Sequence, residues 1–392
     1  MSASPPVIAA SDPNSAIEVI PVRDRYDLDA FLSVPHALYR DDPHWIAPLY
    51  MERRQALSER NPFFRHARWR AWLACADGQP IGRISAQIDQ LHLDRYQDAT
   101  GFFGSIEAPD RPEVFHALFE HAERWLRDNG MRRARGPFNL NINQESGLLV
   151  EGFDSPPYVM MGHARPWYGS HIEALGYRGA MDLLAYQIAV PYTPSTALET
   201  LRKRFSGRIR LRPFDRRRAR EDLEVLRDIF NDAWSDNWSF VPYTVEEFQA
   251  MGKELLLLVP DGFIQIAEVG GEPAAFMVVL PNVNEAIADL GGRLLPFGWA
   301  KLLWRLKVRH PRSVRTPLMG VRRKYHGSPL GPTLAYSVID AALAPSLARG
   351  VERAELSWIL EDNRDMRRII ERIGGVVSKR YRMYDKDLAA DA

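Results

Sequence analysis

Cysteine is almost missing from this sequence, because Cys75 is the single one among 392 residues. A lone cysteine excludes a disulfide framework and indicates a reducing compartment. No run approaches 18 uninterrupted apolar residues, which excludes a membrane-spanning helix. The N-terminal stretch has neither a basic region nor a long apolar run, so residues 1–16 are expected to be a disordered lead rather than a signal peptide. We therefore expect a cytoplasmic protein.

Metal-ligand motifs are missing too. The ten histidines are scattered and no H-E-x-x-H or C-x-x-C occurs, so we expect no metal site and no permanently bound cofactor. Acidic residues are missing locally, since Gly291 to Ile339 holds no Asp or Glu. The net charge of +1 gives no general attraction to nucleic acid, but such a window favours an anionic partner. Its cations are Arg293, Lys301, Arg305, Lys307, Arg309, Arg312, Arg315, Arg322, Arg323 and Lys324.

The chain contains an internal repeat. IEALGY at Ile172 resembles IERIGG at Ile370, 198 residues later, and IEVIPVRD at Ile17 resembles IRLRPFDR at Ile209. Agreement in order and in element type predicts a duplicated domain of about 190 residues. The predicted organisation is a first domain at 17–190, a linker at 191–207 and a second domain at 208–388.

Each half shows the same order of elements. An opening strand leads to helical segments, then to strands, a long helix, a strand, a short helix and a last strand. The long helix of the first half has an apolar stripe and ends at Gly130. Strands that alternate with helices predict an α/β class with a mixed sheet flanked by helices in each domain.

GVRRKYHGSPLG, Gly320 to Gly331, leads directly into a helical pattern. It matches neither the P-loop nor the dinucleotide motif. Backbone N–H groups at a helix N-terminus bind anions, and glycines let the chain approach closely. The stretch therefore predicts a phosphate site, with an ordinary turn on a basic face as the alternative. Its candidate binding residues are Val321, Arg322, Arg323, His326, Gly327, Gly331, Pro332 and Thr333.

The order of elements and this loop resemble the GNAT acyltransferase fold, in tandem. The resemblance implies that the loop holds the pyrophosphate of acyl-CoA as co-substrate. His326 and Pro329 depart from the family pattern, and Ile370 stands where many relatives have a tyrosine that protonates the thiolate. The corresponding loop of the first half carries Glu107 and Asp110, which would repel a pyrophosphate. The first domain is therefore expected to be degenerate.

N-acylation needs a base for the amine and an acid for the thiolate. Glu361 is the expected base, because it ends a strand predicted to be buried, where a carboxyl pKa can rise. Asn363 belongs to the same E-D-N cluster, which alternatively only caps the next helix. Tyr325 is a candidate acid. A backbone N–H of the strand that ends at Met319-Gly320-Val321 would polarise the thioester carbonyl.

Two further segments carry aromatic residues. NDAWSDNWSFVPYT, Asn231 to Thr244, mixes indoles and amides in a way that suits an apolar ligand with a polar head. Its candidate acceptor-binding residues are Asn231, Trp234, Asn237 and Trp238. The insertion GGRLLPFGWAKLLWRLKVRHPR predicts a basic amphipathic helix at 294–309 that lies on a membrane surface or, alternatively, packs on its own domain.

In motif style the E-D-N, NWSFVP and LLPFGWAKLLW stretches resemble the bacterial GNAT-like group that includes bacterial ceramide synthases. This resemblance implies transfer of a long acyl chain from acyl-CoA to an amine, with a sphingoid long-chain base as one such acceptor, at the inner face of the membrane. Two alternatives remain open. One is a GNAT-fold enzyme that acts on a soluble amine or uses aminoacyl-tRNA, and the other is a non-catalytic tandem scaffold.

Overall fold

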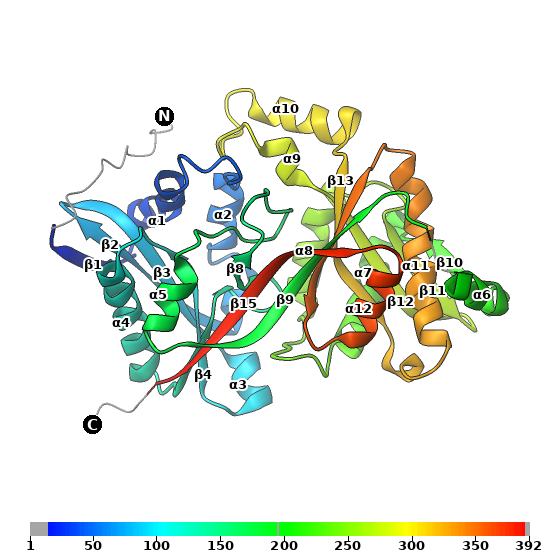
Figure 1. The fold of residues 1–392 in the computed structure, drawn as a ribbon, viewed down its shortest axis with the longest axis horizontal. Coiled ribbons are helices and arrows are strands. Elements are labelled where there is room, and N and C mark those ends of the chain that lie inside the picture. Colours follow the sequence, from blue (N-terminus) through cyan, green and yellow to red (C-terminus); the bar gives the residue numbers. More distant parts are fainter. Residues whose placement is uncertain (1–14, 194–195, 389–392) are drawn as a thin grey trace. The chain divides into compact units, whose positions relative to one another are not determined.

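The computed structural model describes residues 15–193 and 196–388, and Figure 1 shows its helices and strands. The expected lead at 1–16 lies outside the described residues except for its last two positions. The chain forms two compact units. Unit 1 holds the described residues up to Asp182, Ile287–Leu294 and those from Arg380 onward, and unit 2 holds Leu183–Ala286 and Leu295–Lys379. The predicted mixed α/β class is confirmed.

Unit 1 has a mixed sheet with the strand order β1-β2-β3-β4-β5-β15. Neighbouring strands are antiparallel except for β4 and β5, which are parallel. The elements of the first half are β1 (Ile17–Pro21), α1 (Arg25–Leu38), α2 (Tyr50–Ala56), η1 (Pro62–Arg65), β2 (Ala67–Ala76), β3 (Gln79–Asp89), α3 (Gln90–Tyr96), β4 (Thr100–Glu107), α4 (Pro112–Asp128), β5 (Arg133–Gly136), β6 (Phe138–Asn139), β7 (Glu145–Ser146), β8 (Leu148–Glu151), α5 (Tyr168–Ala174) and β9 (Arg178–Ala189).

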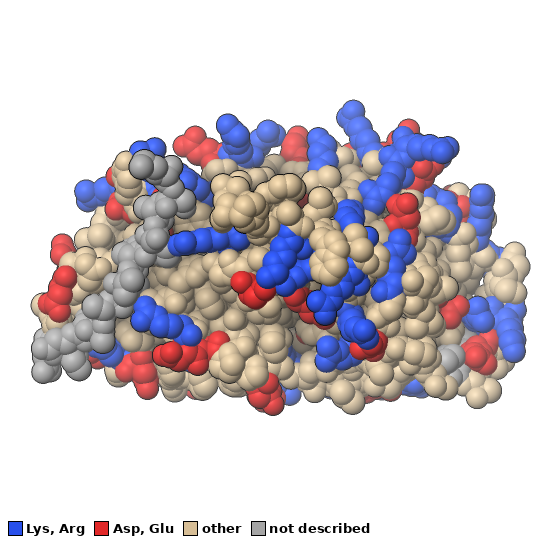
Figure 2. All heavy atoms as spheres, turned by 90° about the horizontal axis from the view of Figure 1, so that it is seen from above, with Lys and Arg blue, Asp and Glu red and all other residues tan. Residues whose placement is uncertain are grey.

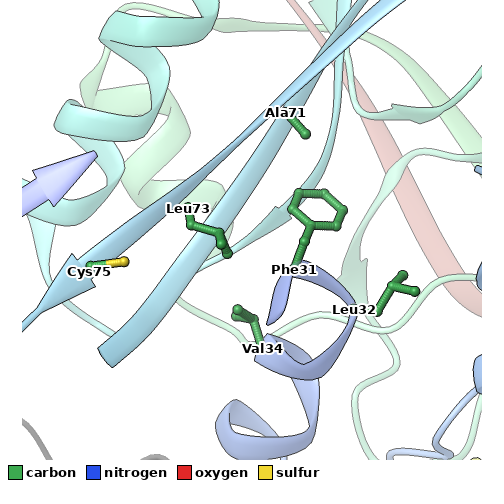
Figure 3. Close-up of a cluster of buried hydrophobic side chains, with 6 residues drawn as sticks. All are labelled: Phe31, Leu32, Val34, Ala71, Leu73 and Cys75. Atoms are coloured by element: carbon green, nitrogen blue, oxygen red, sulfur yellow. The ribbon is translucent and has the colours of Figure 1, made fainter. Parts of the chain in front are cut away.

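Helices α1 and α4 cover the sheet of unit 1 with apolar residues. Helix α4 is the predicted long helix, and the stripe residues Phe115, Leu118 and Leu126 are fully buried. Phe31 of α1 packs with Leu73 of β2 and their neighbours in the cluster shown in Figure 3. The single thiol, Cys75, belongs to this apolar cluster, where burial raises its pKa. It is thus a core residue.

Unit 2 repeats this plan with the strand order β9-β14-β13-β12-β11-β10, in which only β13 and β14 are parallel. The predicted linker contains α6 (Thr196–Phe205), and Arg202 of this helix forms an ion pair with Asp340 of α11 at 3.0 Å. The elements of the second half are β10 (Ile209–Pro213), η2 (Arg216–Arg218), α7 (Ala219–Ala233), α8 (Val245–Leu258), β11 (Ile264–Val269), β12 (Glu272–Pro281), α9 (Val283–Ile287), α10 (Gly298–Trp304), η3 (Arg305–Arg309), β13 (Ser313–Val321), η4 (Arg323–Tyr325), α11 (Leu330–Leu347), β14 (Arg353–Leu360), α12 (Arg364–Arg372) and β15 (Val376–Asp387).

The two halves exchange their last strands. Strand β9 begins in unit 1 and pairs with β14 in unit 2 from Leu183 to Ala189. Strand β15 begins in unit 2 and pairs with β5 in unit 1 from Tyr384 to Asp387. The repeats at 17–190 and 208–388 remain the organisation proposed from the sequence, and the compact units form because each repeat gives its final strand to the other repeat's sheet.

Asp182 fixes the returning strand within unit 1. Its carboxylate accepts hydrogen bonds from Arg382 Nε at 2.8 Å and from Arg380 Nη1 at 2.9 Å. Burial alone would raise the pKa of Asp182, but the hydrogen bonds from the two arginines hold it below its usual value. The folded state therefore favours the ionised carboxylate, and this interaction ties the end of β15 to the start of β9.

We predict that Asp182→Asn lowers the free energy of unfolding by about 2 kcal/mol at pH 7, the usual size for a hydrogen-bonded charge. The pKa of this carboxyl is lower in the folded state, so its stabilising contribution is present above pH 3.8 and is lost as the pH falls through the folded pKa. Urea unfolding measures this. The free energies of unfolding of the wild type and the variant should differ at pH 7 and become similar in acid.

The control is Asp387→Asn on the same strand. Asp387 forms an ion pair with Arg133 at 3.1 Å, but its side chain is 84% exposed. A pair of this kind contributes about 0–1 kcal/mol, so this variant should stay close to wild type. Equal losses in both variants would mean that Asp182 has no special part in holding β15.

Candidate functional site

The parallel pairing of β13 and β14 stops halfway along the strands. It runs from Ser313 opposite Arg353 to Thr316 opposite Leu356. Beyond that point β13 continues to Val321 along β12, and β14 continues to Leu360 along β9. The two strands therefore separate toward their carboxyl ends, and this gap, which we call the β13–β14 wedge, opens beside the predicted phosphate loop.

Unit 1 has the same arrangement, but its own chain fills it. Strands β4 and β5 pair from Thr100 to Phe102. Past that point Ser105 donates its backbone N–H to Asn139 Oδ1 at 2.8 Å, and Gln87 donates to the carbonyl of Phe138 at 2.7 Å. Gly104 lies so close that a Cβ there would be 1.8 Å from the carbonyl oxygen of Phe138. Strand β6 thus occupies the place where β13 and β14 separate in unit 2.

The loop before α4 in unit 1 is also bonded to other side chains of unit 1. Glu107 accepts hydrogen bonds from Tyr39 and Tyr168, each at 2.8 Å, and burial raises its pKa. The backbone N–H of Ala108 donates to Tyr168 Oη at 3.1 Å. This position of unit 1 thus holds a carboxylate and a backbone donor that is already bonded, and the degeneracy of the first domain stays a prediction.

The loop of unit 2 turns tightly into α11. The helix starts at Leu330, and a Cβ on Gly331 would lie 2.7 Å from the carbonyl oxygen of Tyr325, so only glycine fits there. His326 Nε2 lies 2.7 Å from the carbonyl oxygen of Val321, and Gly327 has φ +70° with open space around it. The first-turn N–H groups of an 18-residue helix therefore lie next to the wedge.

Two other predicted loop residues form the start of α11. Pro332 is exposed in the first turn. Thr333 is buried, and its hydroxyl donates to the carbonyl of Pro329 at 2.7 Å. Thr333 thus helps to hold the helix start that the loop presents.

The three loop cations are already paired within unit 2. Arg322 bonds to Asp228 at 2.5 Å, and Lys324 bonds to Glu272 at 2.7 Å. Arg323 forms an ion pair with Asp236 at 3.1 Å. These pairs attach the loop to neighbouring elements, and the expectation that the same side chains supply charge for phosphates stays a prediction. At the start of α11 the N–H of Gly331 donates to the carbonyl of Ser328 at 3.1 Å and Pro332 has no N–H, so the helix dipole is the main feature there that favours an anion.

The loop and the aromatic segment 231–244 lie together. Arg323 donates its backbone N–H to Asp232 at 2.8 Å and its side chain to Ser235 at 2.8 Å. Asn231 is fully used inside the segment, since its side chain bonds both the N–H and the carbonyl of Tyr243. It therefore shapes the segment, whereas Trp234, Asn237 and Trp238 remain partly exposed.

Trp234 connects the two separating strands. Its indole N–H donates to the carbonyl of Met319 on β13 at 2.9 Å. Its ring meets the ring of Trp358 on β14 edge-on, with centroids 5.3 Å apart. The predicted acceptor segment thus contributes a side chain to the wedge itself.

The three expected catalytic residues lie near the carboxyl end of β13 or β14. Tyr325 is partly buried within the loop. Asn363 caps α12, because its side chain accepts from the N–H of Met366 at 3.2 Å. Glu361 follows the last residue of β14 and is exposed. The expectation that Glu361 is buried was wrong, because the strand ends one residue earlier and the chain turns outward.

The buried carboxylate of β14 is Glu355, which sequence reasoning missed. It is 0% exposed and accepts a hydrogen bond from Ser357 Oγ at 2.6 Å. Arg315 of β13 donates to Ser357 Oγ at 2.8 Å, and Lys379 of β15 lies close enough to influence the carboxylate. Burial raises the pKa of Glu355, while Arg315, Ser357 and Lys379 oppose that rise. This network lies where the strand pairing ends.

Two relatives match almost the whole chain. Protein YghO of Escherichia coli (strain K12) is 52% identical over 366 residues, which are 93% of this chain and 94% of that protein. The bacterial ceramide synthase of Caulobacter vibrioides (strain NA1000 / CB15N) is 46% identical over 378 residues, which are 96% of this chain and 98% of that protein. This chain belongs to their family. No protein-family model matches it.

The family has the tandem GNAT fold. A tandem GNAT protein from the clavulanic acid biosynthesis pathway superposes with a TM-score of 0.58 at 12% identity, covering 96% of this chain and 100% of that one. A GCN5-related N-acetyltransferase from Sphaerobacter thermophilus gives a TM-score of 0.52 at 14% identity, covering 95% and 97%. These likenesses confirm the predicted fold.

The described residues contain neither a group of metal-ligand side chains nor a membrane-spanning helix. In 15–193 and 196–388, no three His, Cys, Asp or Glu side chains are grouped so that they could hold a metal ion. Among the same residues, no helix has the length and apolar character needed to cross a bilayer.

We predict that Glu355→Gln keeps the free energy of unfolding within about 1 kcal/mol of wild type at pH 7, because a raised pKa means that the fold does not favour the charged form. The folded protein binds this proton at a higher pH than the unfolded chain. The wild type should therefore gain stability relative to the variant as the pH falls from 7 towards 4.5.

Urea unfolding at pH 7 and pH 5 measures this difference. A large loss of stability at pH 7 would contradict the prediction, since it would show that the ionised carboxylate is the required counter-ion of Arg315.

Proposed function

We propose that the protein is an N-acyltransferase that moves a long acyl chain from acyl-CoA to an amine, with its site in unit 2. The observation that carries the proposal is the β13–β14 wedge, which opens beside a glycine-marked loop and the N-terminus of α11. The same place in unit 1 is filled by Phe138 and Asn139. This difference between the repeats supports a ligand site in unit 2.

In this proposal the pyrophosphate of acyl-CoA lies at the start of α11 and the acyl thioester lies along β13. The helix N-terminus favours the negative charge. A backbone N–H in Met319–Val321, on the edge of β13 that β14 leaves unpaired, polarises the thioester carbonyl. Holding the amine beside the thioester supplies much of the rate.

Glu361 is proposed as the base and Tyr325 as the acid. Glu361 is exposed at the carboxyl end of β14, where an acceptor amine can reach it. Tyr325 lies in the loop itself, next to the expected thiolate. Tetrahedral collapse then forms the amide bond, breaks the carbon–sulfur bond and returns a proton to the sulfur of CoA.

Two observations support the proposed class of acceptor, namely the name of one relative and the aromatic segment 231–244. One relative is named a bacterial ceramide synthase, and Trp234 and Trp238 are partly exposed beside the amide of Asn237. We propose a sphingoid long-chain base as the acceptor. An acceptor of this kind would be met at a membrane, so we also propose a cytoplasmic enzyme peripheral to the inner face.

A second candidate is an acyl-CoA-binding protein without turnover. Ile370 favours it, because this residue is 1% exposed in α12 and brings no hydroxyl to the place where many GNAT relatives have a tyrosine. Incubating the purified protein with acyl-CoAs of graded length and a panel of amines separates the two candidates. Amine-dependent release of free CoA supports the enzyme, and binding without release supports the second candidate.

We predict that Gly331→Glu abolishes acyl-CoA binding, measured by titration calorimetry, because it places bulk and negative charge against the tight turn before α11. The matched control is Gly207→Glu, which adds the same charge where a Cβ meets nothing within 4 Å. Circular dichroism checks that both variants fold. Unchanged affinity in a folded Gly331→Glu protein would rule out the assigned loop.

We predict that Glu361→Gln lowers kcat by on the order of 10²–10⁴-fold, as expected for removal of a general base. Asp362→Asn is the control, since it neutralises the neighbouring exposed carboxylate. Steady-state CoA release at saturating substrate provides the comparison. If Glu361→Gln turns over within a few-fold of the control, another group accepts the amine proton.

A further inference from the structure

The helix formed by α10 and η3 exposes large apolar side chains to solvent. Trp299 is 54% exposed and Phe297 is 77% exposed. Leu257 at the end of α8 is 73% exposed and extends the patch, since its carbonyl accepts from Lys307 of η3 at 3.1 Å. The exposed apolar residues from this insertion, which we call the apolar patch, are Leu295, Phe297, Trp299, Leu303, Trp304 and Val308.

The helix is attached to unit 2 by its other side. Leu306 is buried at 6% exposure. Arg305 donates to the carbonyl of Ala286 at 2.7 Å. Because these contacts hold one side of the helix, the apolar patch is a fixed outer surface of unit 2. An exposed patch of this size usually marks an interaction site.

A cationic cavity lies at the end of the same helix. Its volume is about 240 Å³, and Glu285 is its acidic lining residue. Both oxygens of that carboxylate are used, one by the backbone N–H of Arg312 at 2.9 Å and the other by Ser313 Oγ. The remaining polar groups of the lining are basic and comprise Arg305, Arg309, His310 and Arg312.

The arginines of this cavity are held in different ways. Arg312 also forms an ion pair with Glu352, so part of its charge is balanced. Arg305 donates to the backbone carbonyl of Ala286, which does not neutralise its charge, and Arg309 is exposed at the end of η3. The lining therefore keeps a positive excess. Figure 2 shows many Lys and Arg, with Asp and Glu among them, on the face that it views.

We propose that residues 295–312 form a docking surface for a bilayer that contains anionic phospholipids. The apolar patch enters the interface, and the cavity receives the phosphate of one lipid headgroup. Charge complementarity favours this occupant, because a basic helix with Trp and Leu on its outer face matches an anionic lipid surface.

The docking surface is separate from the candidate acyl-CoA site. Arg312 directly precedes β13, whereas the loop with Arg322 follows it. The surface and the loop are thus at opposite ends of a nine-residue strand. The inference rests on the proposed peripheral location and deepens it by naming the surface and the lipid chemistry, and it can be tested by binding alone, without acyl transfer.

The first experiment is flotation of the full chain with vesicles of phosphatidylcholine alone or with added phosphatidylglycerol. We expect binding to the anionic vesicles at about 50 mM salt, weakened at about 500 mM salt by screening. Absence of binding to anionic vesicles at low salt would overturn the docking surface. That result would leave the acyltransferase proposal untouched, because CoA release is measured separately.

The cavity is tested with the double variant Arg309→Gln, Arg312→Gln. Its binding to anionic vesicles should fall on the order of 10- to 30-fold at low salt. The matched control is Arg217→Gln, Arg220→Gln, which removes the same charge from exposed positions near the start of α7. Equal losses of vesicle binding in both variants would show that only net charge matters. The cavity would then not be the binding site of the lipid phosphate.

The apolar patch is tested with Phe297→Ser, Trp299→Ser and Leu303→Ser combined. Binding should fall at both salt concentrations, because apolar insertion is not screened. A triple Ser variant at the exposed Leu211, Leu347 and Val376 is the control and should bind as wild type does. If the patch variant binds vesicles as well as the wild type does, the apolar patch does not enter the bilayer interface.

A final arm separates a lipid headgroup from free phosphate. Inorganic phosphate is titrated into the wild type and into the cavity variant, with thermal shift as the readout. Weak stabilisation of the wild type alone, together with vesicle binding, supports the headgroup assignment. Stabilisation by phosphate without any vesicle binding would overturn it in favour of a soluble phosphate ligand.

Discussion

The candidate site depends on one constraint, which is that the parallel ladder between β13 and β14 ends at Thr316 and Leu356. Backbone groups that lose their partner strand must find another partner or face solvent or a ligand. In unit 1 the corresponding groups of β4 meet β6, with Asn139 bonded to the backbone of Ser105. In unit 2 the side chain of Trp234 reaches across to Met319 instead. The same interruption is thus bridged by backbone and an amide side chain in one repeat and by an indole side chain in the other.

The duplication therefore explains why the two units share a strand order, and the units differ in the charge of the corresponding loops. Both sheets have the same strand order and one parallel pair at the same place. Their charges have diverged, since Glu107 precedes α4 whereas the corresponding loop of unit 2 is basic. In unit 1 the interrupted ladder is completed by β6, and in unit 2 the proposed acyl-CoA site lies at the same place.

Much of this could be read from the sequence, because the signals are local. Element type, the repeat, the loop before α11 and the basic amphipathic insertion all come from short patterns of glycine, charge and apolar spacing. Pairing partners are not local, so the pattern could not show that Asp228 and Asp236 bind the loop arginines. The buried acid Glu355 of β14 belongs to no motif, so no local pattern singles it out. Burial at the end of a strand is also poorly marked, which is why Glu361 was expected to be buried although it is exposed.

The exchange of last strands has a consequence for synthesis of the chain. The sheet of unit 1 is completed by residues 384–387, which are translated after every strand of the unit 2 sheet. Until they emerge from the ribosome, β5 has one unpaired edge, and such an edge attracts other strands. Unit 2 takes β9 from the first half, which is already available when β14 is made. The C-terminal half of the protein can therefore finish its sheet before the N-terminal half, in reverse of the order in which the two are made.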